Sequence, residues 1–454
     1  MLRNKITSFL LVLFTMLSLA TSVSAISEEN MKKLMQMSEQ ERKFLLMYFD
    51  EDELFVVSAT RSLKSIDRIA ENVEVVTAED IELMNAHTLA DVLRTVNGVQ
   101  VYFTGASPIS LANVGIQGSN FEQVAFFLDG IPLRLSDTNI TVASDIPVQM
   151  IDRVEIIKGP ASSAWGSSLG GVVNIITKSP GSKEKISGTL SASSGEQATM
   201  DFRAEAFGKK DKFGYYFTAG WLGTDGLRSE EEGWQKNLYA KLSYDLSADT
   251  SLLYTIGYDR KNRERSDTSA LDWLDRDKSE RFYTTLSLNS SLSSELDLNI
   301  SLRAMRQRLD VFEKTVSTDE EIRIYHGDEN LYGASAKLAW RHAAHNVVFG
   351  ADYDDSEVNT DSYSSDKRSW AVFANDTIKI GKLAVTPGLR YDDSNTHDGF
   401  LSPSLGLTYE VADKTILRAV VSRGFNAPSI SQTVSDWGLY FVHNPDLEVE
   451  KVWS

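Results

Sequence analysis

Two groups of side chains have the types and spacing that could support chemistry. Gly166-Ser167-Ser168-Leu169-Gly170 matches the G-x-S-x-G pattern in which serine hydrolases hold a nucleophile. That pattern needs a strand-to-helix turn in a parallel α/β sheet, whereas these glycines lead into a β-branched run, so we expect a turn without catalysis. Carboxylates that could bind calcium gather at Asp352, Asp354, Asp355, Asp361 and Asp366. They lack the spacing of a known calcium loop, so we expect a hydrated acidic loop and no resident metal.

The overall composition excludes other kinds of site. The 454 residues carry a net charge of -18, and the acidity argues against a nucleic-acid partner, which would require clustered Lys and Arg. The sequence contains no cysteine, so disulfides, thiolate metal sites and cysteine nucleophiles are excluded. We expect neither a cofactor nor an enzymatic centre. The length predicts two or more structural units.

The N-terminus predicts a cleaved export signal over residues 1–25. Arg3 and Lys5 give a positive start, and Phe9–Leu19 is an apolar core. Val23-Ser24-Ala25 then offers the small residues that a signal peptidase reads. The core is shorter than the roughly 20 apolar residues of a membrane-spanning helix. No later apolar stretch is long enough either, so any membrane insertion must use strands.

Residues 26–60 form a polar linker, and residues 61–178 have the texture of a small mixed α/β unit. Thr77 precedes Asp80 at the spacing of a capping box, which predicts the start of a helix. Positions at helical spacing follow at Leu83, His87, Ala90 and Leu93. The short apolar runs Val124–Leu128 and Val172–Thr177 predict strands.

Residues 179–454 are dominated by a strict alternation of apolar and polar side chains. In one segment, apolar residues occupy every second position from Leu296 to Ala304, and polar residues lie between them. A period of two over ~10 residues is the length and pattern of a transmembrane β-strand. We count about 13 such segments.

The connections between these segments alternate in length. Short ones, such as residues 247–249, alternate with long polar ones at residues 224–234, 261–279, 310–329 and 356–366. An outer-membrane barrel has short turns on one side and long loops on the other, whereas a soluble sandwich has no reason for this asymmetry. The pattern therefore predicts a transmembrane antiparallel β-barrel.

Short motifs recur in a fixed order through the α/β unit. They are Ile116-Gln117-Gly118, Leu128–Pro132, Ile151–Pro160, Ala164-Trp165-Gly166 and Gly170–Thr177. The run Glu53-Leu54-Phe55-Val56-Val57-Ser58-Ala59 precedes them. In this order the motifs resemble the plug of TonB-dependent outer-membrane receptors, and the preceding run resembles the TonB box of that family. Gln117 stands where the family usually has arginine.

The resemblance implies a fold, a location and partners. Residues 61–178 would be a plug inside a barrel of about 22 strands, surrounded by outer-membrane lipid of a Gram-negative bacterium. The partner would be TonB, driven by the inner-membrane energising complex. It would bind the box residues Glu53, Leu54, Phe55, Val56, Val57, Ser58 and Ala59. A β-branched run on a flexible leader can add a strand to the edge of a partner's sheet.

The resemblance also implies energy-coupled uptake of a metal chelate, most often a ferric siderophore, with cobalamin or haem as alternatives. The alternative from another class is a passive porin. A porin has an open lumen and needs no separate N-terminal domain, whereas wide barrels with a plugged lumen are transporters. The plug-like sequence therefore favours the receptor.

Candidate contact residues follow from the same resemblance. Arg153 and Glu155 are expected to make charge contacts between the plug and the barrel wall. Position at the plug apex assigns ligand contacts to Phe103, Ser107, Leu135 and Asn139.

Two further motifs resemble boxes that bracket one external loop in this family. They are Phe425-Asn426-Ala427-Pro428 and Asn444-Pro445-Asp446-Leu447. In haem receptors a histidine that helps to hold the iron lies between such boxes. His443 lies immediately before the second box, and it is therefore a candidate ligand contact.

The number of strands predicts that the barrel is incomplete at its C-terminal end. About 13 strands fall short of the ~22 of plugged transporters, and the chain ends at Lys451-Val452-Trp453-Ser454, where another strand should begin. An open sheet would leave two unpaired edges in lipid. We therefore expect that these residues alone do not form a heat-resistant barrel, which the mobility of unboiled samples on gels would reveal.

Overall fold

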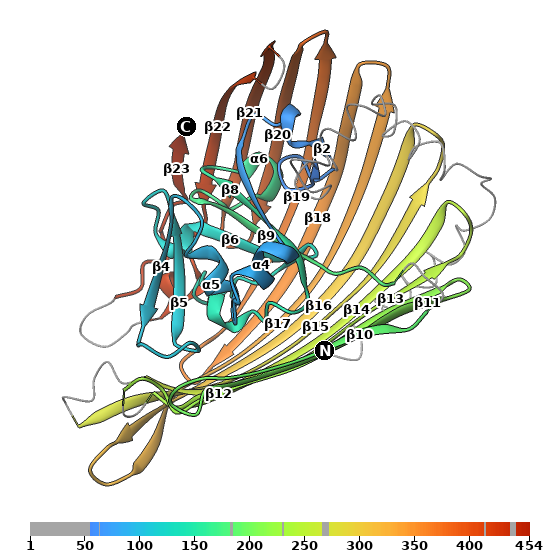
Figure 1. The fold of residues 1–454 in the computed structure, drawn as a ribbon. Helices are drawn as coiled ribbons and strands as arrows, with labels where there is room; N and C mark the ends of the chain where they lie inside the picture. Colours follow the sequence, from blue (N-terminus) through green and yellow to red (C-terminus); the bar gives the residue numbers. More distant parts are fainter. Residues whose placement is uncertain are drawn as a thin grey trace.

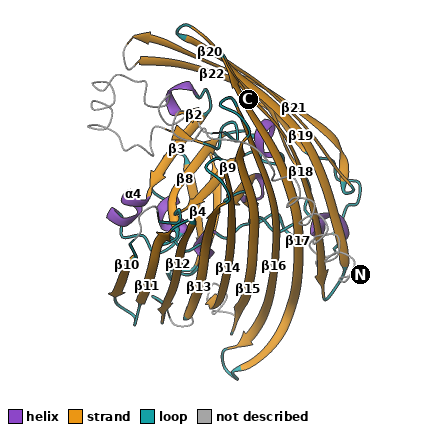
Figure 2. Cartoon of the chain, turned by 90° about the vertical axis from the view of Figure 1, so that its right-hand side faces the viewer, coloured by secondary structure: helices purple, strands orange, loops and turns teal. Residues whose placement is uncertain are grey.

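The computed structural model describes residues 55–62, 64–181, 185–228, 231–265, 272–412, 415–435 and 442–454. The predicted export signal and most of the linker, including Glu53 and Leu54, lie outside these residues. The described chain forms a small α/β domain that lies in the concave face of a large twisted β-sheet (Figures 1 and 2). Within the described residues, no helix is both long and apolar enough to cross a membrane.

A five-stranded sheet forms the centre of the small domain, hereafter the plug. Its order is β3-β8-β9-β6-β7, in which β6 and β9 run parallel and the other neighbours are antiparallel. The strands are β3 (Asn72–Thr77), β8 (Ile151–Lys158), β9 (Gly171–Thr177), β6 (Val124–Leu128) and β7 (Ile131–Pro132). Nearly every residue of β9 is buried, which explains why this strand is a continuous apolar run rather than an alternating one.

Short elements surround this sheet. They are the strands β1 (Phe55–Val56), β2 (Lys64–Ser65), β4 (Val99–Thr104) and β5 (Leu111–Ile116), the helices α4 (Ala78–Leu83), α5 (Leu89–Leu93) and α6 (Ser162–Trp165), and the 3-10 turns η1 (Ile66–Arg68), η2 (Phe121–Gln123) and η3 (Ala143–Asp145). The strands pair as two hairpins, β1 with β2 and β4 with β5.

The predicted helix start at Thr77 is confirmed. The Thr77 hydroxyl accepts the Asp80 N–H at 3.2 Å, and the Asp80 carboxylate accepts the Thr77 N–H at 3.0 Å. The implied continuous helix through Leu93 is wrong, because the chain breaks into α4 and α5. Asn85 lies between them with φ of 50°, a left-handed conformation that ends a helix.

The large sheet has 14 strands, each hydrogen-bonded to its neighbours in sequence, where the sequence predicts about 13. The strands are β10 (Ser187–Ser194), β11 (Met200–Lys210), β12 (Phe213–Thr224), β13 (Gly233–Asp245), β14 (Thr250–Arg265), β15 (Trp273–Ser291), β16 (Leu296–Thr315), β17 (Glu320–His342), β18 (His345–Thr360), β19 (Ser364–Ile380), β20 (Leu383–Ser394), β21 (His397–Ala412), β22 (Thr415–Asn426) and β23 (Glu450–Trp453). Helix α7 (Ile430–Val434) lies between β22 and β23.

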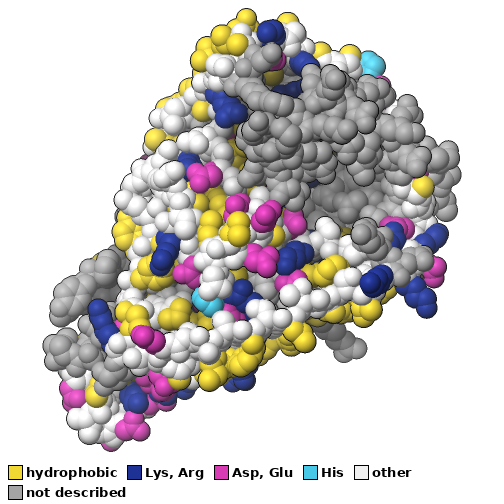
Figure 3. All heavy atoms as spheres, viewed as in Figure 1, with side chains coloured by type: hydrophobic (Ala, Val, Ile, Leu, Met, Phe, Trp, Pro, Cys, Tyr) yellow, Lys and Arg dark blue, Asp and Glu magenta, His cyan; other side chains and the backbone are white. Residues whose placement is uncertain are grey.

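The alternation in the sequence separates the two faces of this sheet. In β13, Leu238 is 57% exposed on the outer face, whereas the adjacent Tyr239 is 4% exposed and faces the plug. Figure 3 shows hydrophobic side chains gathered along the lower outer edge of the molecule. An apolar outer band around a filled interior is the surface that a membrane-spanning sheet presents to lipid.

Three of the predicted long loops are instead mostly strand. Strand β14 continues to Arg265 and β15 begins at Trp273. The connections after β16 and β18 shrink to residues 316–319 and 361–363, because β16 to β19 continue as hydrogen-bonded ribbons. Charges pair across these ribbons, for example Arg306 on β16 with Asp328 on β17 at 2.5 Å. Cross-strand ion pairs allow a polar sequence to remain in a sheet, so polarity alone does not indicate a loop here.

Candidate functional site

The described part of the predicted TonB box is bonded to the plug. Glu155, on β8, is fully buried, and one of its carboxylate oxygens accepts the N–H of Val57 at 2.9 Å and the N–H of Ser58 at 2.8 Å. The same oxygen accepts the Ser58 hydroxyl at 2.6 Å. Arg153 donates to the other oxygen at 2.9 Å. A single carboxylate thus satisfies two backbone donors of the box.

Ser58 is enclosed on its remaining sides. Its hydroxyl accepts the side-chain amide of Asn174 at 3.0 Å, and its carbonyl accepts the indole N–H of Trp165 at 2.6 Å. The side chain of Ser58 is 0% exposed. Because these partners come from β8, β9 and α6, the box can form this site only after the plug has folded.

The segment after the box is bonded to the barrel wall. Arg61 pairs with Asp352 of β18 at 2.5 Å, and Arg390 of β20 binds the same carboxylate at 2.8 Å. The guanidinium of Arg61 also lies 4.6 Å from the centre of the Phe373 ring, a cation–π contact. Lys337 donates to the carbonyl of Arg61 at 2.8 Å. Residues 57–61 therefore link the plug to β17, β18 and β19.

Among the described residues, Arg153 and Glu155 make no ion pair with the barrel wall, contrary to the expectation from the sequence. The bonds of Arg153 go to Asp152 and Glu155, and those of Glu155 go to Arg153 and the box, because β8 is a central strand of the plug. Other ion pairs connect the plug to the wall. They are Arg61–Asp352, Lys178–Glu205, Lys241–Asp129, Lys261–Asp145 and Arg263–Asp145. In addition, His87 is hydrogen-bonded to Asp201 at 2.6 Å.

Asp145 is the most enclosed of these acidic residues. It lies in η3 with a side chain that is 5% exposed, and it binds Lys261 and, at 2.8 Å, Arg263. Burial opposes ionisation of the carboxyl, but Arg263 and Lys261 outweigh it and lower the pKa of Asp145 to about 2. The pair fixes the plug against β14.

Asp145→Asn is expected to lower the free energy of unfolding at neutral pH by about 3–5 kcal/mol, because two buried cations lose their shared carboxylate. A depressed pKa means that this stabilisation is present above the unfolded pKa, and it is lost as the pH falls from 3.8 toward about 2. Urea unfolding at several pH values would measure the difference. Asp152→Asn is the control, since the Asp152 side chain is 33% exposed and should contribute under about 1 kcal/mol. A difference that persists undiminished to the lowest pH would contradict the assignment.

The plug apex around Leu135 and Asn139 is tied to the wall. Asn139 is 1% exposed and donates its side-chain amide to the carbonyl of Ala427 at 2.8 Å. The N–H of Ser136 donates to the carboxylate of Glu329 on β17 at 2.9 Å. Asn139 therefore holds the apex in place and is not accessible to a ligand, contrary to the expectation from its position. Leu135 is half-buried beside it.

The second predicted apex loop also divides into two kinds of residue. Ser107 is 4% exposed, and its N–H and hydroxyl bond to Ser110 and Ile109 within the loop, so its side chain is not available to a ligand. Phe103, on β4, is 38% exposed. His443 is exposed too, so these two predicted contacts are accessible in the described structure.

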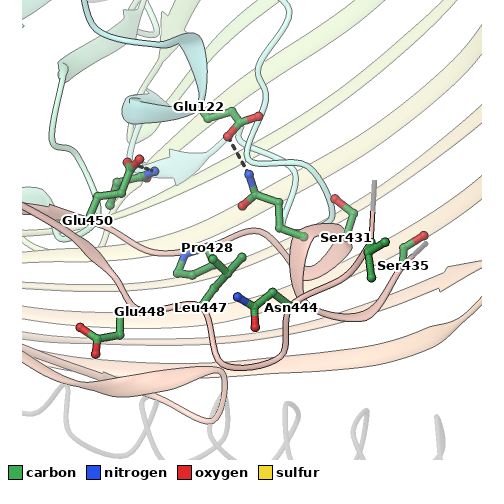
Figure 4. A pocket seen from close by; sticks show the side chains of 11 residues that line it. Glu122, Pro428, Ser431, Ser435, Asn444, Leu447, Glu448 and Glu450 are labelled. Atoms are coloured by element: carbon green, nitrogen blue, oxygen red, sulfur yellow. Dashed lines mark hydrogen bonds between the residues drawn. The ribbon is translucent and has the colours of Figure 1, made fainter. Parts of the chain in front are cut away.

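A cavity of about 440 Å³ lies between the plug and the connection from β22 to β23 (Figure 4). Its wall brings together Asn426 and Pro428 of one predicted box with Asn444 and Leu447 of the other. The plug contributes Glu122, which accepts the side-chain amide of Gln432 at 3.1 Å. The resemblance places the two boxes on either side of one external loop. Neither their meeting at a cavity nor the plug residue that completes it is indicated by a motif.

The cavity has an acidic lining. Glu122, Glu448 and Glu450 line it, and Glu450 accepts side-chain amides from Gln123 at 2.9 Å and from Asn426 at 3.1 Å. Burial, reinforced by Glu450, raises the pKa of Glu122 against the opposing hydrogen bond from Gln432. A site of this kind can accept donor groups from a ligand.

The two groups of residues with potential chemistry have other roles. Gly166–Gly170 connects a helix to a strand, the reverse of a nucleophile elbow, and the Ser168 hydroxyl donates to the carbonyl of Gly166 at 3.1 Å. Asp352 and Asp354 lie within β18 rather than in an acidic loop, and each binds an arginine. Asp361 lies in the short turn after β18 and pairs with Arg323 at 3.4 Å.

A folded plug, an antiparallel sheet with an apolar outer face and an N-terminal segment bonded to both define a plugged outer-membrane barrel. The family model of the TonB dependent receptor-like β-barrel matches residues 187–454, and the model of the TonB-dependent receptor plug domain matches residues 65–172. The chain therefore belongs to the TonB-dependent receptor family, and it is an outer-membrane protein. Members of this family are transporters and receptors, so the family assignment favours a receptor over the passive porin.

Curated relatives include two cobalamin transporters. Vitamin B12 transporter BtuB from Vibrio vulnificus is 27% identical over 434 residues, covering 89% of this chain and 66% of that protein. Vitamin B12 transporter BtuB from Vibrio cholerae serotype O1 (strain M66-2) is 24% identical over 406 residues, covering 84% of this chain and 64% of that protein. The chain thus spans about two thirds of the length of these relatives.

Solved structures share the fold. The alcaligin outer membrane receptor FauA from Bordetella pertussis has a TM-score of 0.69 at 18% identity, covering 83% of this chain and 66% of that chain. The siderophore receptor PirA from Pseudomonas aeruginosa has a TM-score of 0.63 at 22% identity, covering 84% of this chain and 70% of that chain.

Proposed function

We propose that the protein imports a metal chelate across the outer membrane with energy delivered by TonB. The observation that carries this proposal is the docked segment Val56–Ala59. It is held by side chains of the plug through its backbone N–H groups, and strand addition to a partner would use the same kind of backbone donor. Pulling on this segment would act directly on Glu155 in the plug and on Asp352 in the wall.

Two classes of chelate are candidates for the ligand. A ferric siderophore follows from the resemblance of the sequence to the family, and siderophore receptors are among the proteins of the same fold. Cobalamin is favoured by a separate observation, since the two relatives described above are cobalamin transporters. The cavity beside Glu122 is the proposed outer binding site for either ligand.

Uptake by cells that produce the receptor tests both proposals. Radiolabelled ferric siderophores and radiolabelled cobalamin would be supplied in parallel, with and without a protonophore that dissipates the proton-motive force. We expect accumulation of one class, abolished by the protonophore. Accumulation that ignores the protonophore would contradict energy coupling, whatever the ligand.

Haem is the remaining ligand alternative, and it depends on His443. His443→Ala is expected to leave growth on haem as the iron source unchanged, because a single exposed histidine beside a common box is weak support for an iron ligand. Growth on haem at matched expression is the measurement. His345→Ala is the control for loss of another histidine, since His345 is 45% exposed at the start of β18. A growth defect confined to haem and to His443→Ala would place haem above both other candidates.

A further inference from the structure

The plug contacts the barrel wall differently on its two sides. Toward β12–β17, the apolar core of the plug continues into the wall. The wall residues in that core are Tyr216, Tyr239, Tyr283, Met305 and Leu331. Buried polar bonds reinforce this side, including Tyr216 to the carbonyl of Gln149 at 3.1 Å and the pairing of Asp145 with Arg263. Separating these surfaces would expose apolar area and unpaired buried charges to water.

The opposite side of the plug faces a charged cavity. A space of about 150 Å³ separates the plug from β18–β20. Its charged lining comprises Arg61, Arg134, Arg303, Asp352, Asp354, Lys367, Arg390, Asp392 and Asp393. The apolar core of the plug contains no side chain from β18–β20 among the described residues. The lining also includes aromatic side chains, among them Phe127 and Trp165. Its charged groups can hydrogen-bond to water once the two surfaces separate, which the apolar core on the other side cannot.

The segment directly after the TonB box makes several of the bonds that cross this charged side, and the plug apex adds those of Ser136 with Ser356 and of Asp137 with Tyr363. Arg61 binds Asp352, the carbonyl of Thr60 accepts the side-chain amide of Asn375 at 3.2 Å, and Lys64 donates to Thr377. Helix α6 adds fewer contacts: the carbonyl of Ala164 accepts a bond from Arg390 at 3.4 Å, and Ser162 accepts the N–H of Phe425 at 3.1 Å. Withdrawal of residues 57–62 and Lys64 would therefore remove the bonds that Thr60, Arg61 and Lys64 make across this side.

We infer that the ligand passes between the plug and β18–β20, through the charged cavity, while the body of the plug stays against β12–β17. This inference rests on the proposed function, because the passage opens when TonB withdraws the segment that includes Arg61. The cavity already reaches from Arg61 beside the box to Arg134 beside the plug apex. Its enlargement requires that the segment and α6 leave the wall and that the apex bonds of Ser136 with Ser356 and of Asp137 with Tyr363 break.

The lining also defines the chemistry that the passage accepts. Arg134 and Lys367 face the cavity, and neither forms an ion pair with any residue that the structure describes. The full charged lining holds five cations and four aspartates, so both signs face the cavity. A hydrophilic chelate that carries both acceptor oxygens and hydrogen-bond donors is the cargo that suits this wall.

A disulfide across the charged side tests the route. A Cβ atom built on Gly388 of β20 lies 3.8 Å from the Cβ of Ser163 in α6, within the range that a disulfide spans. Because the chain has no cysteine, Ser163→Cys/Gly388→Cys forms this one bond alone. We expect the oxidised receptor to lose uptake of the radiolabelled siderophore or cobalamin down to the background of cells without the receptor, while surface binding stays normal. Dithiothreitol should restore uptake, which shows that the variant is folded.

Thiol labelling supplies the second measurement. Ser369→Cys lines the charged cavity, whereas Thr218→Cys lies 5% exposed on β12 beside Tyr216. During energised uptake, an impermeant maleimide should label Ser369→Cys and not Thr218→Cys. Uptake by the oxidised double variant at the rate of its reduced form, or labelling of Thr218→Cys in preference to Ser369→Cys, would overturn the route and leave energy coupling intact. Loss of the protonophore effect in the wild type would instead overturn the proposed function.

Discussion

Val57→Pro is expected to abolish accumulation of ligand inside the cell while ligand still binds at the surface. Proline lacks the backbone N–H and fixes φ, so the segment loses a donor that strand addition to TonB would use. The structure adds a second loss, because the N–H of Val57 donates to Glu155 at 2.9 Å in the docked state. One substitution therefore removes both the hydrogen bond from residue 57 to Glu155 and the backbone bond that this residue would donate to TonB.

Val57→Ala is the matched control, since it keeps the backbone donor and removes only part of a half-buried side chain. We expect uptake close to that of the wild type. Uptake of the radiolabelled ligand and binding at the cell surface would be measured in the same cells at matched expression. Uptake by Val57→Pro at the wild-type rate would refute the role of this segment in coupling.

Glu155→Ala is expected to release the box from the plug. The substitution leaves the N–H groups of Val57 and Ser58 and the guanidinium of Arg153 without their shared carboxylate. Removing one partner of a buried charged pair costs about 3–5 kcal/mol. The hairpin of β1 and β2 has only two residues in each strand, and its pairing is too weak to keep the segment docked against that cost. The undocked segment should therefore become the dominant state.

A nitroxide on Phe55→Cys would report this release as a gain in mobility in its electron paramagnetic resonance spectrum. Glu74→Ala is the control on the same sheet, because Glu74 pairs with Lys158 but is 35% exposed and does not touch the box. Its spectrum should match that of the wild type. An immobile label in Glu155→Ala would mean that Asn174 and Trp165 alone hold Ser58 in place.

The sequence predicts local features well where each depends on nearby residues. Three features follow from chemistry within a few positions. They are the capping box of Thr77 and Asp80, the alternation along β13 and the strand predicted at Val172–Thr177. The sequence does not predict the end of α4 at Asn85, because two short helices and one long helix share the same apolar spacing. The polar composition of residues 310–329 predicts a loop. In the structure these residues belong mostly to β16 and β17, whose register places opposite charges across from one another.

The site depends on contacts that no local pattern encodes. Ser58 and Glu155 lie 97 positions apart, and Arg61 and Asp352 lie 291 apart, so only the topology brings them together. The resemblance predicts a charge contact of Glu155 with the barrel wall, whereas its carboxylate binds Ser58 of the box. The position of Asn139 in an apex loop predicts a ligand contact. In the structure its side-chain amide instead donates to the carbonyl of Ala427.

The strands β16 and β17 are longer than a membrane crossing requires. β17 has 23 residues, and at about 3.3 Å per residue it extends about 75 Å. Tilted by about 40°, it rises about 58 Å, against an apolar band about 25 Å tall, so about 30 Å of it stands outside the lipid. In Figure 1 the joined ends of β16 and β17 project beyond the neighbouring strands. The ion pair of Lys314 with Asp319 at 2.7 Å lies at this end. A protein that binds there would meet paired charges held by the strands, so salt should weaken its binding.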